Sequence, residues 1–551
     1  MADKQRLELT WIGKNAPQYD ATNIEPRILI EDTEKSYGDS NTENMLIHGD
    51  NLLALKALEQ KYSGKIKCIY IDPPYNTGNA FEHYDDNLEH STWLNLMKPR
   101  LEILKNLLSN DGIIFIQIDD EEMAYLKVLC DEIFGRNNFI TSICIRMSTP
   151  SGVKTSHKFK KIIKEKEYIL VYSSERDKVR FNPQYVPKLD WENEFQYWLE
   201  KNNSNCPDDW KVKRLNDVLK DRCIDNDPDN PKFKEFVIRN SDKIWRRAFI
   251  RNEFKTISQQ NPDRVIYNID NNEKEHYYYR GREMYFYSNK FNKCFTENGY
   301  ELLPSNLIGD LWTDINTGKL FNEGGVNFRN GKKPEFLIAR LIDMTTSDND
   351  IVLDSFLGSG TTAAVAHKMN RRWIGVELGE ACYTHCIPRL KRVIDGEDTG
   401  GITKSVDWKN GGGFKFYELS SSLLKKDSFG NWIIDEKYNA DMLGAAMCKH
   451  EGFTYNTDEE IYWKQGQSTE KDFIFITTSF LTLEHLDKIH EEMKPDESLL
   501  ICCKAYQEAC DNRYENITIK KIPQMILDDC EFGKTDYNLN IINVPDYEEE
   551  E

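Results

Sequence analysis

The chain contains 551 residues, 39% of them hydrophobic and 12% aromatic, and carries a net charge of −20. This length predicts roughly three or four domains of about 100–200 residues each, and the aromatic content argues against a disordered chain. We expect a cytoplasmic protein with no membrane contact, because no apolar run reaches the roughly 18–20 residues of a membrane span and the N-terminus lacks the apolar stretch of a secretory signal.

The first predicted unit is an α/β segment within residues 1–140. Apolar periodicity predicts a strand at 45–50, a helix at 51–62, a buried strand at 67–72, a helix at 91–108 and a buried strand at 112–119. Strands that alternate with helices imply a parallel sheet with crossover connections.

Residues 141–310 have a different composition and predict an inserted domain. Residues 141–300 contain 31 basic and 24 acidic side chains, whereas residues 415–551 contain 14 basic and 29 acidic ones. Because phosphate binding depends on local basic side chains, the acidic total does not exclude a nucleic-acid partner. Candidate backbone contacts, which are also typical of a solvated face, are Lys154, Lys158, Lys160, Lys161, Arg246, Arg247 and Arg251.

The α/β pattern returns in the predicted segment 311–410 and again in the acidic segment 411–551. The expected elements of the former are a helix at 334–344, a strand at 351–356, a helix at 361–370 and a strand at 371–378. Three glycines at 411–413 predict a hinge before the acidic segment, for which dimerisation and partner docking both stay open.

Cysteine spacing predicts no metal site. Thirteen cysteines are scattered along the chain and none forms a CxxC pair, the pattern typical of zinc sites. We interpret them as small buried hydrophobic residues of a reducing compartment.

The sequence Asp72-Pro73-Pro74-Tyr75 follows a buried strand, at the edge where open α/β sheets carry their chemistry. Two prolines remove two amide donors, so the turn presents carbonyl oxygens and one carboxylate. Such an acceptor-rich turn suits an –NH2 group, and Tyr75 adds a flat ring for stacking. A strand that simply ends in Pro-Pro beside an acid is the alternative.

A second pattern, residues 352–362, combines a strand, the turn Gly358-Ser359-Gly360 and the start of a helix. Glycines let the backbone approach a ligand, and a helix start supplies free amides. No Gly-Lys-Ser/Thr follows, which excludes a P-loop. Glu377 ends the next strand, where an acid accepts hydrogen bonds from ribose hydroxyls. The combination suits an adenosine without phosphates, such as S-adenosylmethionine; a plain glycine-rich loop is the alternative.

Together the two patterns resemble the permuted β group of amino-methylating DNA methyltransferases, in which the catalytic motif precedes the cofactor motif. His48-Gly49-Asp50 and Lys333-Pro334-Glu335 are similar to further family loops, and Ser355 stands where proline is usual. The resemblance implies a Rossmann-like, mixed but mostly parallel methyltransferase sheet, with a target-recognition domain at 141–310 and a C-terminal α/β region. The implied cofactor-binding residues are Asp50, Asp72, Lys333, Pro334, Asp354, Phe356, Gly358, Gly360, Thr361, Thr362 and Glu377.

Asn76-Thr77-Gly78 and the opening segment 9–14 look like the modification subunits of type III restriction-modification systems. The resemblance covers roughly residues 5–175 and 305–395. It implies double-stranded DNA as substrate, S-adenosylmethionine as cofactor, and a homodimer as one possible assembly. Because the chain has no Walker A sequence, an ATP-dependent restriction subunit would have to be a separate chain.

The implied reaction is methyl transfer to the N6 amine of an adenine flipped out of the duplex. Asp72 and the Pro73 carbonyl would accept the two N–H bonds and aim the nitrogen lone pair at the methyl group. The alternatives are cytosine-N4 methylation, a non-catalytic cofactor-binding specificity subunit, and RNA as substrate. Aspartate at the first motif position favours adenine, because the cytosine-N4 group usually has serine there.

Overall fold

The computed structural model describes residues 8–16, 19–21, 24, 27–76, 89–148, 162–188, 190–201, 207–249, 253–270, 273–318, 320, 323–328, 331–420, 424–426, 432–434, 444–445, 447–448, 451–458 and 461–522. Two compact units divide the chain: Phe181–Ile315 with Thr399–Lys409 form one, and the other holds the remainder. Within the described ranges, no helix has the length and apolar character needed to cross a membrane.

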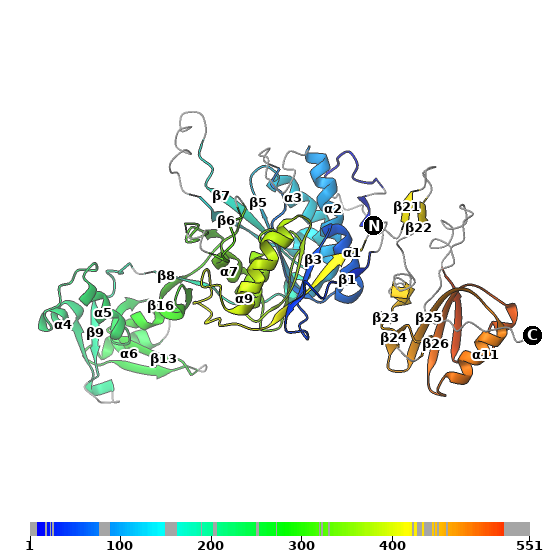
Figure 1. The fold of residues 1–551 in the computed structure, drawn as a ribbon. Helices are drawn as coiled ribbons and strands as arrows, with labels where there is room; N and C mark the ends of the chain where they lie inside the picture. Colours follow the sequence, from blue (N-terminus) through cyan, green and yellow to red (C-terminus); the bar gives the residue numbers. More distant parts are fainter. Residues whose placement is uncertain are drawn as a thin grey trace, which may run out of the picture. The chain divides into compact units, whose positions relative to one another are not determined.

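A large mixed sheet forms the centre of the first unit (Figure 1), with strand order β1-β20-β3-β19-β18-β4-β5-β7-β6. The strands from β20 to β5 pair in parallel, whereas β1, β7 and β6 pair antiparallel. Their bounds are β1 (Leu29–Glu31), β3 (Met45–His48), β4 (Ile66–Ile71), β5 (Leu108–Ile118), β6 (Phe139–Arg146), β7 (Lys166–Ser173), β18 (Ile351–Asp354), β19 (Arg372–Glu377) and β20 (Gly413–Leu419).

Helices connect these strands, and the sequence pattern predicted those at 51–62, 91–108, 334–344 and 361–370. The helices are α1 (Asn51–Tyr62), α2 (His90–Leu107), α3 (Met123–Cys130), α7 (Glu335–Thr345), α8 (Thr361–Lys368) and α9 (Ile387–Asp395). Helix α1 packs on α2, while α8 packs on both α7 and α9. Leu55, Leu101, Ile116 and Leu353 are fully buried in one hydrophobic core. The predicted Rossmann-like, mostly parallel α/β sheet is therefore confirmed.

The structure draws two domain boundaries differently from the sequence prediction. Strands β6 and β7 lie within the predicted inserted domain 141–310, yet they extend the large sheet next to β5. Their side chains explain this, because Ile145 and Leu170 are fully buried. Strand β20 lies in the predicted C-terminal segment 411–551, but it pairs with β3 and buries Phe416. The compact inserted unit starts at Phe181.

The second unit contains a sheet of order β10-β9-β11-β14-β13-β12 and a smaller sheet of order β15-β16-β8. Helices α4 (Leu215–Asp221) and α5 (Pro231–Arg239) contribute to a core that includes Phe195, Trp198 and Phe233. Other bounds are β8 (Tyr185–Pro187), β9 (Tyr197–Glu200), β10 (Lys211–Arg214), β11 (Ile244–Ala248), α6 (Phe254–Gln260), β12 (Ile266–Ile269), β13 (Glu275–Tyr279), β14 (Arg282–Phe286), β15 (Phe291–Thr296) and β16 (Gly299–Leu307).

The C-terminal segment forms its own sheet of order β23-β24-β25-β26-β27. Strands β25, β26 and β27 are parallel, and α11 (Leu483–Glu492) connects β25 to β26. This arrangement agrees with the predicted C-terminal α/β region. The strand bounds are β23 (Thr454–Tyr455), β24 (Gly466–Thr469), β25 (Asp472–Leu481), β26 (Ser498–Tyr506) and β27 (Ile517–Lys521).

Candidate active site

The two sequence motifs lie next to each other because their strands, β4 and β18, are paired neighbours in the sheet. Leu353 of β18 is in register with Ile69 of β4, and the strands are parallel. Asp72 follows the last residue of β4, and Asp354 is the last residue of β18. Two stretches almost 300 positions apart therefore end at the same carboxyl edge, where open α/β sheets bind ligands.

The carboxylate of Asp72 faces the ammonium group of Lys333. Lys333 Nζ lies 2.8 Å from Asp72 Oδ2, and the Asp72 side chain is only 18% exposed. Its other oxygen, Oδ1, is buried and has no hydrogen-bond partner among the residues that the structure describes. Burial raises the pKa of Asp72, the Lys333 charge opposes this rise, and the Glu167 carboxylate adds to it. The site thus holds one engaged and one unused acceptor oxygen.

Tyr75 is fixed by its hydroxyl group. The Tyr75 hydroxyl donates to Glu167 Oε2 at 2.8 Å and accepts from Lys333 Nζ at 2.9 Å. Burial, followed by the charges of Asp72 and Glu167, raises the pKa of Tyr75 well above its usual value, so the ring stays a neutral phenol. Lys333 Nζ also lies 4.9 Å from the ring centroid, within the range of a cation–π contact.

Lys333 balances the two carboxylates around it. Burial alone would lower the pKa of Lys333, but the Asp72 and Glu167 charges outweigh burial and leave this pKa raised. Lys333 Nζ is 3.7 Å from Glu167 Oε2, so one ammonium serves both acids and the Tyr75 hydroxyl. This lysine precedes Pro334, the N-cap residue of α7, which sets where the side chain enters the site.

Glu167 was missed by the sequence analysis. It lies on β7, inside the segment predicted to be the inserted domain, and no motif marks it. The structure shows Gln117 Nε2 donating to Glu167 Oε2 at 2.6 Å, and Tyr70 donating to Gln117 Oε1 at 2.6 Å. Pairing of β7 with β5 brings these side chains together, and only recognition of that antiparallel pair could have predicted it.

The glycine-rich turn is shaped for close backbone approach. Gly358 and Gly360 have φ angles of +55° and +79°, in the left-handed region that favours glycine. The Gly358 amide donates to Glu377 Oε2 at 2.7 Å, and the Gly379 amide donates to Glu377 Oε1 at 3.0 Å. The predicted ribose acceptor Glu377 therefore lies directly against the turn.

Asp354 stabilises the same turn through two hydrogen bonds. It accepts from the Phe356 amide at 2.9 Å and from the Thr362 hydroxyl at 2.6 Å. Burial raises the pKa of Asp354 to about 7, against the effect of these two hydrogen bonds. Thr361, also predicted for cofactor binding, instead accepts from Arg389 at 2.7 Å and is buried.

Asp50, the predicted adenine contact, is the N-cap of α1. Its Oδ1 accepts from the Leu52 and Leu53 amides at 2.9 and 3.2 Å, and its Oδ2 lies 3.1 Å from Arg100. The next residue, Asn51, donates to the Ser355 carbonyl at 2.7 Å. The loop after β3 is thereby tied to the glycine-rich turn after β18.

A buried charge network under the turn was also missed. Lys368 and Arg389 each bind the Glu335 carboxylate, at 2.8 and 2.7 Å, and all three side chains are inaccessible to solvent. Lys368 also lies 2.7 Å from Asp398. Arg389 reaches the turn through Thr361, so the network links α7, α8 and α9 to the cofactor motif. The signal in the sequence that could have predicted this network is the presence of single charged residues within otherwise apolar stretches.

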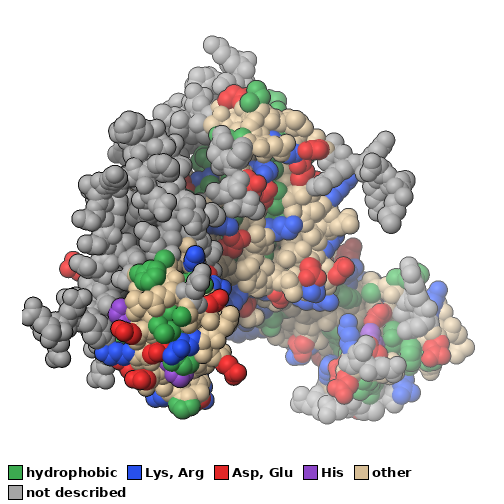
Figure 2. Space-filling model, turned by 90° about the vertical axis from the view of Figure 1, so that its right-hand side faces the viewer, with side chains coloured by type: hydrophobic (Ala, Val, Ile, Leu, Met, Phe, Trp, Pro, Cys, Tyr) green, Lys and Arg blue, Asp and Glu red, His purple; other side chains and the backbone are tan. Residues whose placement is uncertain are grey.

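The predicted DNA contacts fall in several places. Lys154, Lys158, Lys160, Lys161 and Arg251 lie outside the described residues. Arg246 and Arg247 lie on β11 of the second unit, where Arg246 forms an ion pair with Glu194 at 2.6 Å. On the face drawn in Figure 2, basic and acidic side chains are interspersed. The net charge alone therefore identifies no binding face.

The mostly parallel α/β sheet carries an acceptor-rich turn beside a glycine-rich turn at one edge, as expected of a Rossmann-like methyltransferase fold. The profile of the family described as "DNA methylase" matches residues 66–386, from β4 to the segment before α9, and includes both turns. The chain belongs to this DNA methylase family.

Relatives with similar sequence carry type III names. The chain is 40% identical to the probable type III restriction-modification enzyme HindVI Mod subunit of Haemophilus influenzae, over 69% of this chain and 54% of that protein. It is 29% identical to the EcoPI Mod subunit of Escherichia phage P1, over 67% of this chain and 62% of that protein. The matched part of the chain thus spans between half and two thirds of the length of these two relatives.

Among solved structures, the chain resembles the PvuII DNA methyltransferase (cytosine-N4-specific), with 15% identity and a TM-score of 0.33. The match covers 67% of this chain and 92% of that one.

Proposed function

We propose that the protein transfers a methyl group from S-adenosylmethionine to the N6 amine of adenine in double-stranded DNA. The observation that carries this proposal is the pairing of β4 with β18, which puts the Asp72 turn and the glycine-rich turn at one sheet edge. The family membership supports methylation, and the names of the relatives support a role as the modification subunit of a restriction-modification system.

The residues at this edge fit the proposed cofactor. The backbone at Gly358 and Gly360 leaves room for close approach, and Glu377 already accepts hydrogen bonds beside the turn. The buried Asp72 Oδ1 lacks a partner within the described chain, as expected of an acceptor kept for a ligand. The cofactor supplies an activated methyl group; Asp50, Glu377 and the residues of the glycine-rich turn would hold it.

The amine-binding step follows from the contacts of Lys333. Its ammonium group occupies the acceptor Asp72 Oδ2, and its contacts with Glu167 and the Tyr75 hydroxyl hold it there. The amine of a flipped adenine would therefore bind at the buried Oδ1, which has no partner within the described residues. Asp72 and the Pro73 carbonyl would then accept the two N6 hydrogens and orient the lone pair.

Proton release completes the reaction. Transfer of the methyl group that the cofactor would supply leaves the amine nitrogen positively charged and therefore acidic. Asp72 would accept the departing proton, since it would already hold an amine hydrogen and burial raises the pKa of its carboxyl group. Stacking of the base on Tyr75 would return roughly 1–3 kcal/mol toward the cost of flipping.

The remaining assignments extend the same proposal. The second compact unit would be the target-recognition domain. It is inserted in the sequence between two parts of the methyltransferase sheet, and the relatives are named as Mod subunits of restriction-modification enzymes. The C-terminal sheet would serve dimerisation or docking of a separate ATP-dependent restriction subunit. We place the protein in the cytoplasm, where its DNA substrate lies.

The test is a transfer assay with labelled cofactor and duplex DNA, followed by nucleoside analysis. N6-methyladenine is the expected product, whereas N4-methylcytosine would establish the alternative base and an unlabelled duplex would refute catalysis. Asp72→Ala should abolish transfer while cofactor binding, measured by calorimetry, stays largely intact. Labelled RNA in a parallel reaction would separate the two nucleic acids.

A further inference from the structure

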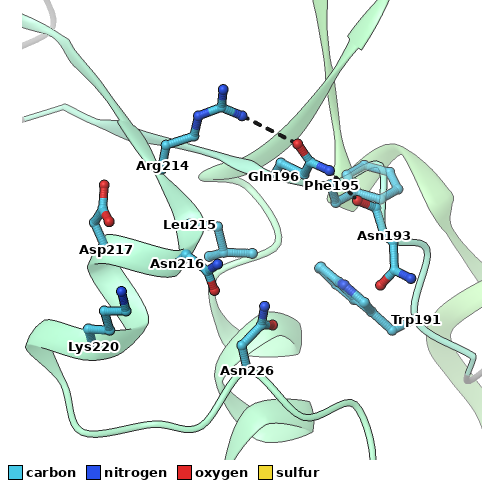
Figure 3. Close-up of a pocket in the computed structure, with 10 residues that line it drawn as sticks. All are labelled: Trp191, Asn193, Phe195, Gln196, Arg214, Leu215, Asn216, Asp217, Lys220 and Asn226. Atoms are coloured by element: carbon cyan, nitrogen blue, oxygen red, sulfur yellow. Dashed lines mark hydrogen bonds between the residues drawn. The ribbon is translucent and has the colours of Figure 1, made fainter.

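The second compact unit contains a pocket of about 520 Å³ that the proposed transfer chemistry does not use (Figure 3). Three segments line it: the chain before β9, the junction of β10 with α4, and the loop after α4. Trp191 and Leu215 give it apolar surface, and Figure 3 shows both side chains bordering the same hollow. The rest of the lining is mainly polar.

Carboxamides dominate this polar lining. Asn193, Gln196, Asn216 and Asn226 all border the pocket. Each carboxamide offers a donor and an acceptor side by side, the pairing that matches the edge of a nucleobase. In the described part of the chain, Asn216 and Asn226 make no side-chain hydrogen bond. Their hydrogen-bonding capacity is therefore available to a ligand.

Gln196 is held in a defined orientation. Its Nε2 donates to the Asn193 carbonyl at 3.0 Å, and its Oε1 accepts from Arg214 at 3.3 Å. Figure 3 shows these two contacts along one wall of the pocket. The amide is thus fixed by its neighbours, and it links the pocket to the arginine at its rim.

Two arginines share one aromatic ring beside the pocket. The Arg214 and Arg247 guanidinium carbons lie 4.7 and 4.9 Å from the centroid of Tyr197. No carboxylate of the described residues forms an ion pair with either, in contrast to Arg246, which pairs with Glu194 at 2.6 Å. Ring contacts restrict the guanidinium groups while their charges stay uncompensated, an arrangement suited to phosphate.

We infer that the amide-lined pocket receives the edge of a nucleobase of the recognition site, with Arg214 and Arg247 on the adjoining phosphates. The inference rests on the proposed DNA substrate and names the residues of this chain that read it. Asp217 and Lys220, also in the lining, would accept from an exocyclic amine and donate to a ring or carbonyl acceptor of the base. The mixed donors and acceptors of the pocket suit a base, and the arginines beside Tyr197 suit the phosphates.

Binding measurements that need no methyl transfer test the rim. The affinity of the full chain for labelled duplex DNA is measured by anisotropy at several salt concentrations. Arg214→Gln and Arg247→Gln should each reduce the steepness of the plot of log affinity against log salt concentration by about 0.9, as expected for one lost phosphate contact. Arg239→Gln is the matched control, because Arg239 lies in the same unit and already pairs with Glu235 at 2.8 Å. Unchanged slopes in both variants would overturn the phosphate assignment.

Sequencing of duplexes selected from a random pool tests the pocket. Asn216→Ala and Asn226→Ala should each lower the preference for one base at one position of the selected motif by about tenfold or more. Asn289→Ala, from the same unit, should select the wild-type motif. The same motif in all proteins would overturn base reading. Failure of the proposed function would be visible separately, as selective DNA binding by a wild-type chain that transfers no methyl group.

Discussion

Lys333 Nζ lies 2.8 Å from Asp72 Oδ2 and 3.7 Å from Glu167 Oε2, so a single ammonium group neutralises two carboxylates at the edge of the sheet. The contact joins residues 261 positions apart, from either side of the inserted unit. In the proposed reaction this ammonium keeps Asp72 ionised through Oδ2, while the unpartnered Oδ1 receives the target amine. The pH dependence of activity should therefore depend on Lys333.

Lys333→Met should move the acid limb of the pH profile of kcat to higher pH. Asp72 must be ionised to accept the amine hydrogens, and its pKa is already raised by burial and by Glu167. Loss of the opposing Lys333 charge would raise that pKa further, so protonation would silence the enzyme at a higher pH. Rates from pH 5 to 9 would show this. An unshifted limb would contradict the electrostatic role, and Lys56→Met, on the surface of α1, is the control.

The Tyr75 ring and its hydroxyl should contribute separately to activity. Tyr75→Ala should lose roughly 1–3 kcal/mol of base stacking, or about 5- to 150-fold in kcat/KM. Tyr75→Phe and Tyr75→Trp should retain part of the activity because they keep a flat ring. Fluorescence of 2-aminopurine at the target position would report flipping directly. Equal losses in all three variants would rule out stacking.

Glu167 should act through Tyr75, as a positioning residue. The hydrogen bond between them, 2.8 Å long, is removed by Tyr75→Phe and weakened by Glu167→Gln. Because the two substitutions affect the same contact, we expect the double variant to lose much less than the product of the two single losses in kcat. Independent, multiplicative losses would show that Glu167 has another role. Cofactor affinity should stay unchanged in all three variants.

The sequence predicted much of the sheet and both turns because each is a local pattern. Apolar runs marked β4, β5, β18 and β19, and the prolines and glycines marked the turns that follow β4 and β18. The family resemblance implied that both turns belong to one methyltransferase sheet, and the structure shows that β4 and β18 are paired neighbours. Local patterns cannot show which distant strands pair, so β6, β7 and β20 were assigned to other segments.

Side-chain contacts were the least predictable part of the site. Glu167 belongs to an ordinary strand, and nothing in its neighbours marks a role until β7 lies beside β5. Asp50 and Thr361 were predicted for the cofactor, but their positions also serve a helix cap and a buried arginine. Such roles depend on partners that are far away in the sequence, and one sequence alone does not show which distant residues are in contact.

The buried network around Glu335 should make the cofactor turn dependent on Arg389. The Arg389 and Glu335 side chains are inaccessible to solvent, and Arg389 Nη1 also donates to the Thr361 hydroxyl at 2.7 Å. Arg389→Met removes this arginine from Glu335, which stays paired with Lys368, and should cost about 3–5 kcal/mol in the free energy of unfolding. It should also weaken cofactor binding, because the turn loses an anchor. Urea denaturation measures the change in stability, and calorimetry measures the change in cofactor affinity.

Arg372→Met is the control, because it removes only a surface ion pair with Glu43 and should change stability by less than about 1 kcal/mol. Full cofactor affinity in a destabilised Arg389→Met protein would show that the network supports the fold without shaping the turn.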